Sequence, residues 1–213
     1  MGTRTRKLAR HFALSALALS LLCSCETSGA AQPTSIETAD RSALQPTVRQ
    51  SDDSGQNLPF ATRFPRRWNS GNDGTPYEPC TAADSTLLET AGLQASSVKD
   101  AASVDFQTAR GCTWDYKDYE LASLSQTVGD SRGLDVYKQN RRTDTTWLGD
   151  IEVSTRRVAL GVSRDETGCG TYLESGNSVV ATSALFIYKP PPISEICDKA
   201  IAFTRATIDQ MPE

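Results

Sequence analysis

Four cysteines in the second part of the chain are the strongest constraint on its fold. They stand at Cys80, Cys112, Cys169 and Cys197. In a compartment that lacks cytosolic reductants, an even number of cysteines usually forms disulfides. Three pairings are possible, and we favour Cys80–Cys112 and Cys169–Cys197, because each joins a predicted terminal helix to a nearby predicted strand. A zinc site is the alternative, but the chain has no C-x2-C pair and no histidine other than His11.

The N-terminal segment predicts export to such a compartment. Four basic residues precede an apolar run over residues 12–22, and the first acidic residue is Glu26. A basic stretch followed by an apolar core of about 7–15 residues is typical of a secretory signal. The run is shorter than the roughly 20 residues that a membrane-spanning helix needs. We therefore expect residues 1–24 to be a cleaved signal peptide, with an uncleaved anchor as the alternative.

The predicted cleavage region, Leu22-Cys23-Ser24-Cys25, resembles the lipobox of bacterial lipoproteins. In that family the final cysteine receives a diacylglyceryl group before the signal peptidase cuts ahead of it. The resemblance implies lipidation of Cys25 and a location on the extracytoplasmic face of the cell membrane. Two or more acyl chains give stable anchoring, whereas one chain is marginal. Cys23 stands where Ala, Ser or Thr is commoner, so an ordinary secretory signal with incidental cysteines is the alternative.

The charge of the expected mature chain argues against two classes of partner. Removal of residues 1–24 takes away four of the 22 basic residues and none of the 26 acidic residues, which changes the formal charge from −4 to −8. An acidic protein repels nucleic acid and anionic lipid head groups. We therefore expect no nucleic-acid partner, and no sequence motif indicates a cofactor or a metal.

Composition divides the mature chain into a tether and a domain. Residues 25–75 carry the expected lipidated cysteine and a stretch rich in Ser, Thr, Gly, Ala, Pro, Gln and Asn. Such a stretch buries too little apolar surface to offset the entropy of ordering it, so we interpret it as a disordered tether. The cluster from Phe60 to Trp68 is less typical of a tether and predicts either a flap on the domain or a docking motif. Residues 76–213 have the size of one domain.

Residue patterns in the domain predict an α+β fold. Helices are expected near Thr81, where Asp84 completes a capping pair, over residues 131–141, and from Ser194 to Pro212. Alternating or β-branched stretches predict strands at 98–107, 112–116, 119–128, 157–163, 169–174 and 178–188. Short connections favour a mainly antiparallel sheet covered by the N- and C-terminal helices, stabilised by two disulfides.

The order of these features resembles a family of actinobacterial cell-envelope lipoproteins whose domain has no known function. The matching segments are Cys25, Tyr77-Glu78-Pro79-Cys80-Thr81, Gly111-Cys112-Thr113-Trp114, Gly168-Cys169, Cys197 and Met211-Pro212. The resemblance implies a secreted, disulfide-bonded α+β domain on a lipid tether. It assigns no catalytic residues.

Catalytic motifs are scarce. Ser96-Ser97-Val98-Lys99 has the S-x-x-K spacing of penicillin-recognising enzymes but lacks their K-T-G and S-D-N partners, and there is no G-x-S-x-G elbow. Paired carboxylates can hydrolyse glycans without histidine. Asp115, Asp118 and Glu120 form the densest acidic cluster and would be the candidates for that chemistry.

Two groups of residues are candidates for ligand binding. Trp114 and Tyr116 flank the acidic cluster and could form a saccharide-binding face, although a core position beside Cys112 is the simpler interpretation. The doublets Arg141-Arg142 and Arg156-Arg157 could hold a phosphate or carboxylate if the fold brought them together. Dispersed surface charge is the simpler interpretation of the doublets.

The leading hypothesis is a non-enzymatic module of the cell envelope that binds a partner protein, a lipid or a glycan. An envelope hydrolase that uses paired carboxylates on a glycan is the alternative. A structural spacer without a specific ligand is the third possibility.

Overall fold

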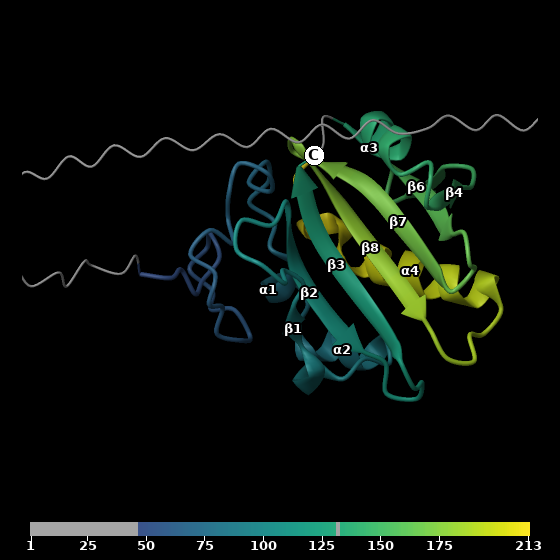
Figure 1. Cartoon of the computed structure of the whole chain (residues 1–213), viewed down its shortest axis with the longest axis horizontal. Coiled ribbons are helices and arrows are strands. Elements are labelled where there is room, and N and C mark those ends of the chain that lie inside the picture. Colours follow the sequence, from purple (N-terminus) through teal and green to yellow (C-terminus); the bar gives the residue numbers. More distant parts are fainter. Residues whose placement is uncertain (1–46, 131–132) are drawn as a thin grey trace, which may run out of the picture. The chain divides into compact units, whose positions relative to one another are not determined.

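A computed structural model describes residues 47–130 and 133–213 of the chain (Figure 1). The predicted signal peptide and Cys25 lie outside these residues. In the described part of the chain, no helix is long and apolar enough to span a membrane.

The core of the fold is one antiparallel sheet of eight strands. Its order is β1-β2-β3-β8-β7-β6-β4, and β5 pairs with β6 beyond this path. The strands are β1 (Lys99–Asp100), β2 (Ala109–Asp115), β3 (Ala122–Asp130), β4 (Thr145–Trp147), β5 (Ile151–Val153), β6 (Arg156–Ser163), β7 (Gly168–Ser175) and β8 (Ser178–Phe186). The mainly antiparallel sheet predicted from the sequence is confirmed.

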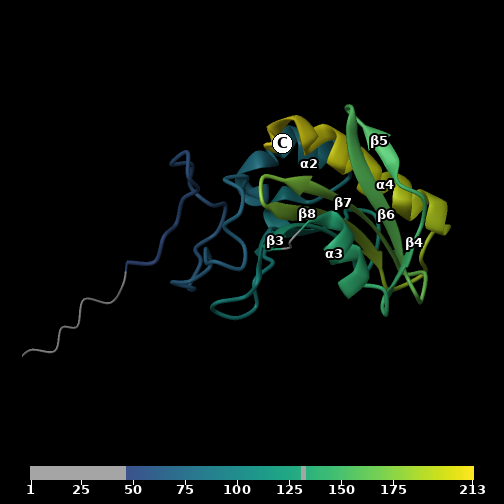
Figure 2. The same ribbon diagram turned by 90° about the horizontal axis from the view of Figure 1, so that it is seen from above.

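Four α-helices and two 3-10 turns accompany the sheet. The helices are α1 (Pro79–Ala82), α2 (Ser85–Thr90), α3 (Leu134–Asn140) and α4 (Ile193–Thr207), and the turns are Ala95–Ser97 and Ile208–Gln210. Helix α4 runs along one face of the sheet, while α3 lies on the opposite side (Figures 1 and 2). The single helix predicted near Thr81 is two short ones, because Glu78 caps α1 while Asp84 accepts a hydrogen bond from the Leu87 amide and starts α2.

Strand alternation determines which side chains meet α4. Cys169, Thr171 and Leu173 of β7 point to the α4 side, because Cys169 is bonded to Cys197 and the Thr171 hydroxyl is hydrogen-bonded to that of Thr204. Ile196, Ala200 and Phe203 of α4 are at most 1% exposed. On this side Trp114 and Leu124 complete a continuous apolar core.

Both favoured disulfides are confirmed. Cys80–Cys112 joins α1 to β2, and Cys169–Cys197 joins β7 to α4. Each bridge therefore ties a terminal helix to a strand. Since the bridges close loops of 32 and 28 residues, each constrains the unfolded chain to a similar degree.

The folded unit begins earlier than the predicted boundary at residue 76. Residues 47–75 are irregular but packed, and they belong to the same compact unit as the sheet. Arg67 explains the difference, because its guanidinium is buried and donates hydrogen bonds to Glu78 (2.8 Å) and Asp100 (3.2 Å). A polar composition does not prevent a segment from packing when its charged groups find buried partners.

The other differences from the predicted elements are local. The strand expected over 98–107 ends at Asp100, and the loop that follows is held by Gln107, whose side-chain oxygen accepts a hydrogen bond from the Ser103 amide. The backbone of Phe106 has φ +62°, which a strand does not allow. Strands β4 and β5 were not predicted, because three residues are too few to show alternation.

Candidate functional site

The sheet face opposite α4 carries a row of small side chains. Gly161, Gly170, Ser183, Ser125 and Thr113 lie directly opposite one another across β6, β7, β8, β3 and β2. The solvent side of an antiparallel sheet commonly carries larger polar residues. Here the small side chains leave room above the middle of the sheet.

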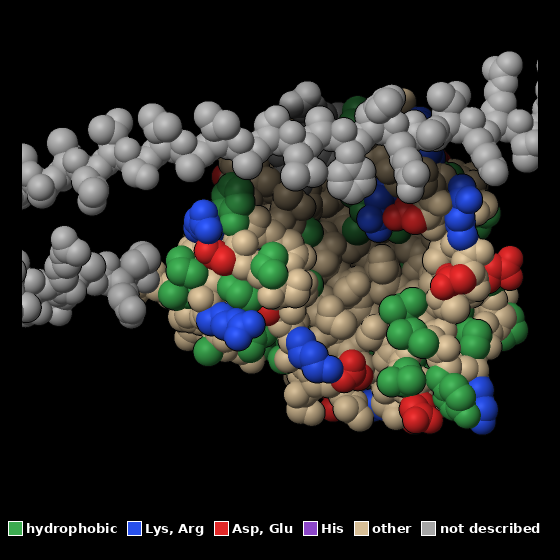
Figure 3. Space-filling view, viewed as in Figure 1, with side chains coloured by type: hydrophobic (Ala, Val, Ile, Leu, Met, Phe, Trp, Pro, Cys, Tyr) green, Lys and Arg blue, Asp and Glu red, His purple; other side chains and the backbone are tan. Residues whose placement is uncertain are grey.

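This room is a hollow of about 460 Å³, which we call the open-face hollow. Its floor is formed by the row of small residues together with Ser123 and Gly168, and its rim includes Arg141, Asp144, Tyr172 and Leu185. Figure 3 shows the depression as a largely uncharged surface over the central strands. Thr113, Ser123, Ser125 and Ser183 are half-buried there, so their hydroxyls lie at the surface of the hollow.

Two glycines of the floor allow aromatic rings to lie across the sheet. A Cβ atom on Gly161 would come within 3.1 Å of the Trp147 ring, and one on Gly170 would lie 2.8 Å from the Tyr172 hydroxyl oxygen. Trp147 and Tyr172 contact each other edge to face, with ring centroids 5.0 Å apart. Glycine at these positions therefore shapes the wall of the hollow.

The polar groups of the rim gather near the C-terminal end of α3. Arg141 and Asp144 form an exposed ion pair at 3.6 Å. Tyr172, Ser183 and Arg141 line the same part of the hollow. Burial raises the pKa of Tyr172 above its ordinary value. This end of the hollow thus offers donors and acceptors next to aromatic surface.

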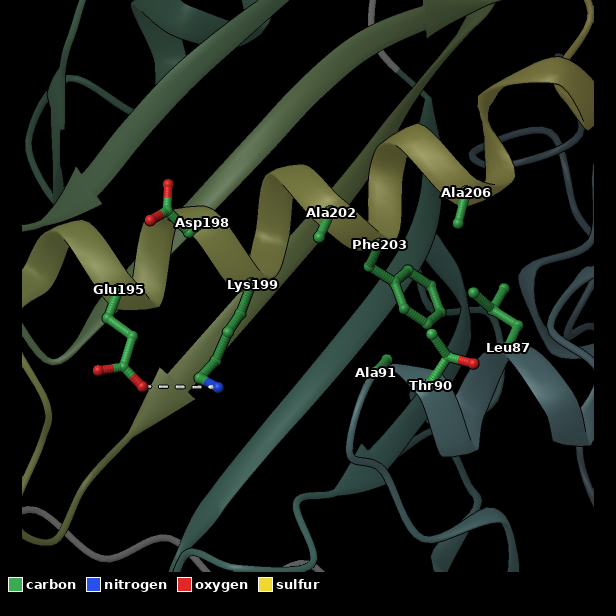
Figure 4. Close-up of a pocket in the computed structure, with 9 residues that line it drawn as sticks. All are labelled: Leu87, Thr90, Ala91, Glu195, Asp198, Lys199, Ala202, Phe203 and Ala206. Carbon is green, nitrogen blue, oxygen red and sulfur yellow. Dashed lines mark ion pairs between the residues drawn. The ribbon is translucent and has the colours of Figure 1, made fainter.

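A second concave surface lies between α2 and α4 (Figure 4). This groove has a volume of about 350 Å³ and is lined mainly by Leu87 and by alanines such as Ala91 and Ala202. Its Glu195 and Lys199 are paired with each other at 3.6 Å. The groove therefore offers mostly apolar contact and fewer hydrogen-bonding groups than the open-face hollow.

Trp114 and Tyr116, the candidates for a saccharide-binding face, lie in the core. Trp114 is 1% exposed and packs against Phe203 with ring centroids 5.7 Å apart. Tyr116 is 4% exposed and stacks on Phe186 at 5.0 Å. Neither side chain lines the open-face hollow.

The structure does not bring the arginine doublets together as one anion site. Arg156 donates hydrogen bonds to the carbonyls of Ile208 and Met211, and Arg157 binds the carboxylates of Asp150 and Asp135, so both have protein partners. Arg142 is exposed and is not part of the hollow. Only Arg141 of the four reaches the open-face hollow.

The acidic cluster expected for hydrolysis is dispersed. Asp115 is paired with Lys99 at 2.9 Å, and Asp118 and Glu120 are exposed in the β2–β3 turn. Within the described residues, Asp144 is the one carboxylate that lines the hollow. No group of three or more His, Cys, Asp or Glu side chains in the described ranges could hold a metal ion.

Apart from Arg141, the residues of the hollow are not among the candidates that the sequence suggests. Ser123, Ser125 and Thr127 alternate along β3, and Gly168 and Gly170 alternate along β7. Alternating small residues were therefore a visible signal. The sequence pattern does not give the register of the strands, and it is the register that brings these small residues into one row.

Comparison with known proteins assigns the chain to a family but does not assign it a function. No curated protein and no solved structure matches the chain. The model of a family described as a protein of unknown function (DUF3558) matches residues 21–210. The matched span therefore covers nearly all of the folded unit and includes Cys25. The chain belongs to this family of unknown function, DUF3558.

Proposed function

We propose that the protein is a non-enzymatic binding module of the cell envelope, held by lipid on Cys25, and that it binds an uncharged saccharide in the open-face hollow. The observation that carries the proposal is the in-register row of Gly161, Gly170, Ser183 and Ser125 with Thr113, which makes an uncharged, hydroxyl-bearing floor.

The chemistry of the floor suits a neutral, hydroxyl-rich ligand. Serine and threonine hydroxyls both donate and accept hydrogen bonds, as sugar hydroxyls do. At the rim, Arg141 supplies fixed donors and Asp144 supplies acceptors within the same small region. A ligand with a net charge would lose hydration over this floor without gaining an opposite charge there. A neutral saccharide avoids that cost.

The envelope location is supported by two independent features. The chain forms two disulfides, which persist in oxidising compartments. The N-terminal sequence has the order of a lipoprotein signal, and the family match extends across Cys25. A binding module on the extracytoplasmic face of the cell membrane would have direct access to the saccharides of the envelope.

Binding explains the geometry better than hydrolysis does. Glycosidases place two carboxyl groups about 5–9.5 Å apart on either side of the scissile bond. Among the carboxylates of the described residues only Asp144 lines the hollow, and it is paired there with Arg141. We therefore assign Asp144 to ligand binding.

The proposal is tested by filling the floor of the hollow. Ser125→Val replaces a hydroxyl of the row with a methyl group and adds a second methyl group, so we expect at least tenfold weaker binding of neutral oligosaccharides. The measurement is a glycan array followed by NMR titration of the best oligosaccharide. Thr127→Val is the matched control, because Thr127 lies two residues along β3 on the same face but outside the hollow.

The control variant should bind within twofold of the parent. If no neutral oligosaccharide binds, or if Ser125→Val binds as tightly as the parent, the proposed function is wrong. An equal loss in both variants would also contradict it, because the effect would then come from the strand and not from the hollow.

A further inference from the structure

Three large apolar side chains stand exposed at one end of the open-face hollow. Leu121, Leu185 and Ile187 are 63%, 37% and 63% exposed, and we call them the apolar ridge. The Ile187 amide donates a hydrogen bond to the Leu121 carbonyl (3.1 Å), so β3 and β8 remain adjacent here. Leu185 also lines the hollow, which makes the ridge continuous with the floor.

Strand alternation places Leu185 on the face of the hollow. Ser183 and Leu185 point to this face of β8, and Ile187 comes directly after the last residue of β8, where its amide is hydrogen-bonded to Leu121. Figure 3 shows hydrophobic side chains gathered beside the hollow, over the end of β8. A molecule lying in the hollow would therefore contact the ridge if it extended past Leu185.

Leu121 adopts an unusual backbone conformation in the turn between β2 and β3. Its backbone has φ +53°, in the left-handed region that leucine seldom adopts and that glycine or asparagine adopts more readily. Local strain of this kind is often found at functional sites. The chain thus holds an exposed leucine at a strained position, next to two further exposed aliphatic residues.

We propose that the ligand of the open-face hollow is an amphiphile: a neutral saccharide that carries an alkyl or acyl chain. The saccharide lies over the Ser and Thr hydroxyls of the floor, and the chain lies along the apolar ridge. This proposal rests on the proposed function and adds the second half of the ligand. Burial of the chain against the ridge removes apolar surface of both molecules from water.

The test uses a series of alkyl maltosides with chains of about 6 to 10 carbons, each below its critical micelle concentration. Maltose is the reference without a chain. For the parent protein we expect affinity to rise about two- to fourfold for each added methylene group. Isothermal titration calorimetry or NMR titration measures the dissociation constants. The experiment uses the folded chain from residue 44 to 213, which forms one compact unit.

The test variant is Leu121→Asn with Ile187→Ser, which removes two of the three ridge side chains, keeps Leu185 and leaves the floor intact. Asparagine tolerates the left-handed conformation at residue 121, so the variant should fold. The matched control is Val104→Ser with Leu148→Ser, because these side chains are 59% and 43% exposed but lie outside the ridge and the hollow. The ridge variant should lose most of the dependence on chain length, and the control should keep it.

The outcomes separate this proposal from the proposed function. If maltose or another neutral saccharide binds but the chain adds no affinity, the hollow binds sugars and the amphiphile proposal is wrong. If chain length raises affinity equally in the parent and the ridge variant, the chain binds elsewhere and the proposal is also wrong. If alkyl maltosides bind through the ridge while Ser125→Val has no effect, the ridge is an apolar site and the saccharide function fails.

Discussion

Arg67 shows how one residue incorporates an apparently unstructured segment into the fold. Its side chain is fully buried and reaches two carboxylates, Glu78 at 2.8 Å and Asp100 at 3.2 Å. Glu78 is also bound by Arg110 at 2.8 Å, so two guanidinium groups and two carboxylates neutralise one another inside the protein. Removing one member leaves an uncompensated buried charge, which costs far more than an exposed ion pair contributes.

Substitution of Arg67 should therefore destabilise the protein strongly. Arg67→Met roughly keeps the length of the side chain but removes the arginine that is paired with Asp100, and we expect the free energy of unfolding to fall by about 3 kcal/mol. The matched control is Arg66→Met, because the neighbouring Arg66 is 63% exposed and pairs with Asp105 at the surface. Its loss should cost less than about 1 kcal/mol. Urea unfolding of both variants measures the difference, and equal stabilities would contradict the structural role of Arg67.

At the scale of elements, residues 47–75 are a packed segment of the domain. They contain no helix and no strand, only the isolated β-bridge between Ser51 and Asn57. Leu58 is 8% exposed and belongs to the main apolar core, and Phe60 and Trp68 pack against it. Asn72 holds the segment to the loop before β2 through a hydrogen bond to the Gln107 carbonyl (3.0 Å). The segment is therefore held by both apolar and polar contacts.

If the stability of the domain depends on residues 47–75, a truncation at residue 76, the boundary predicted from composition, should lower it. A fragment of residues 76–213 lacks Arg67 and the apolar contacts of the segment, whereas a fragment of residues 44–213 keeps the whole compact unit. We expect the longer fragment to unfold cooperatively and the shorter one to lose several kcal/mol of stability. Circular dichroism during urea unfolding measures both. Equal midpoints would show that the segment is dispensable.

At the scale of the whole molecule, the early start of the folded unit shortens the proposed tether. Cys25 and the first described residue, at position 47, are 22 residues apart. A chain of this length spans at most about 80 Å when fully extended, less than half of what the 50 residues expected from composition would allow. The domain is thus limited to the neighbourhood of the membrane surface if lipid is attached at Cys25.

Lipid attachment itself is tested on the full chain. A clickable palmitate analogue should label the parent and should not label Cys25→Ala, because the thiol of Cys25 is the proposed acceptor. Cys23→Ala is the matched control and should retain the label, since alanine is common at that position of a lipobox. Labelling of Cys25→Ala, or loss of label in Cys23→Ala alone, would contradict the proposed anchor.

The sequence by itself determined the features that depend on local pattern. The apolar periodicity of α4, the alternation in β2, β3, β6, β7 and β8, and the even number of cysteines each follow from residues close together in the chain, and the structure confirms the elements and both disulfides. The tertiary structure alone decided that Arg67 is buried and that Gly161, Ser183 and Ser125 lie in one row. These features depend on strand register and on contacts between segments that are distant in the sequence. A local sequence pattern does not report the free energy of such contacts.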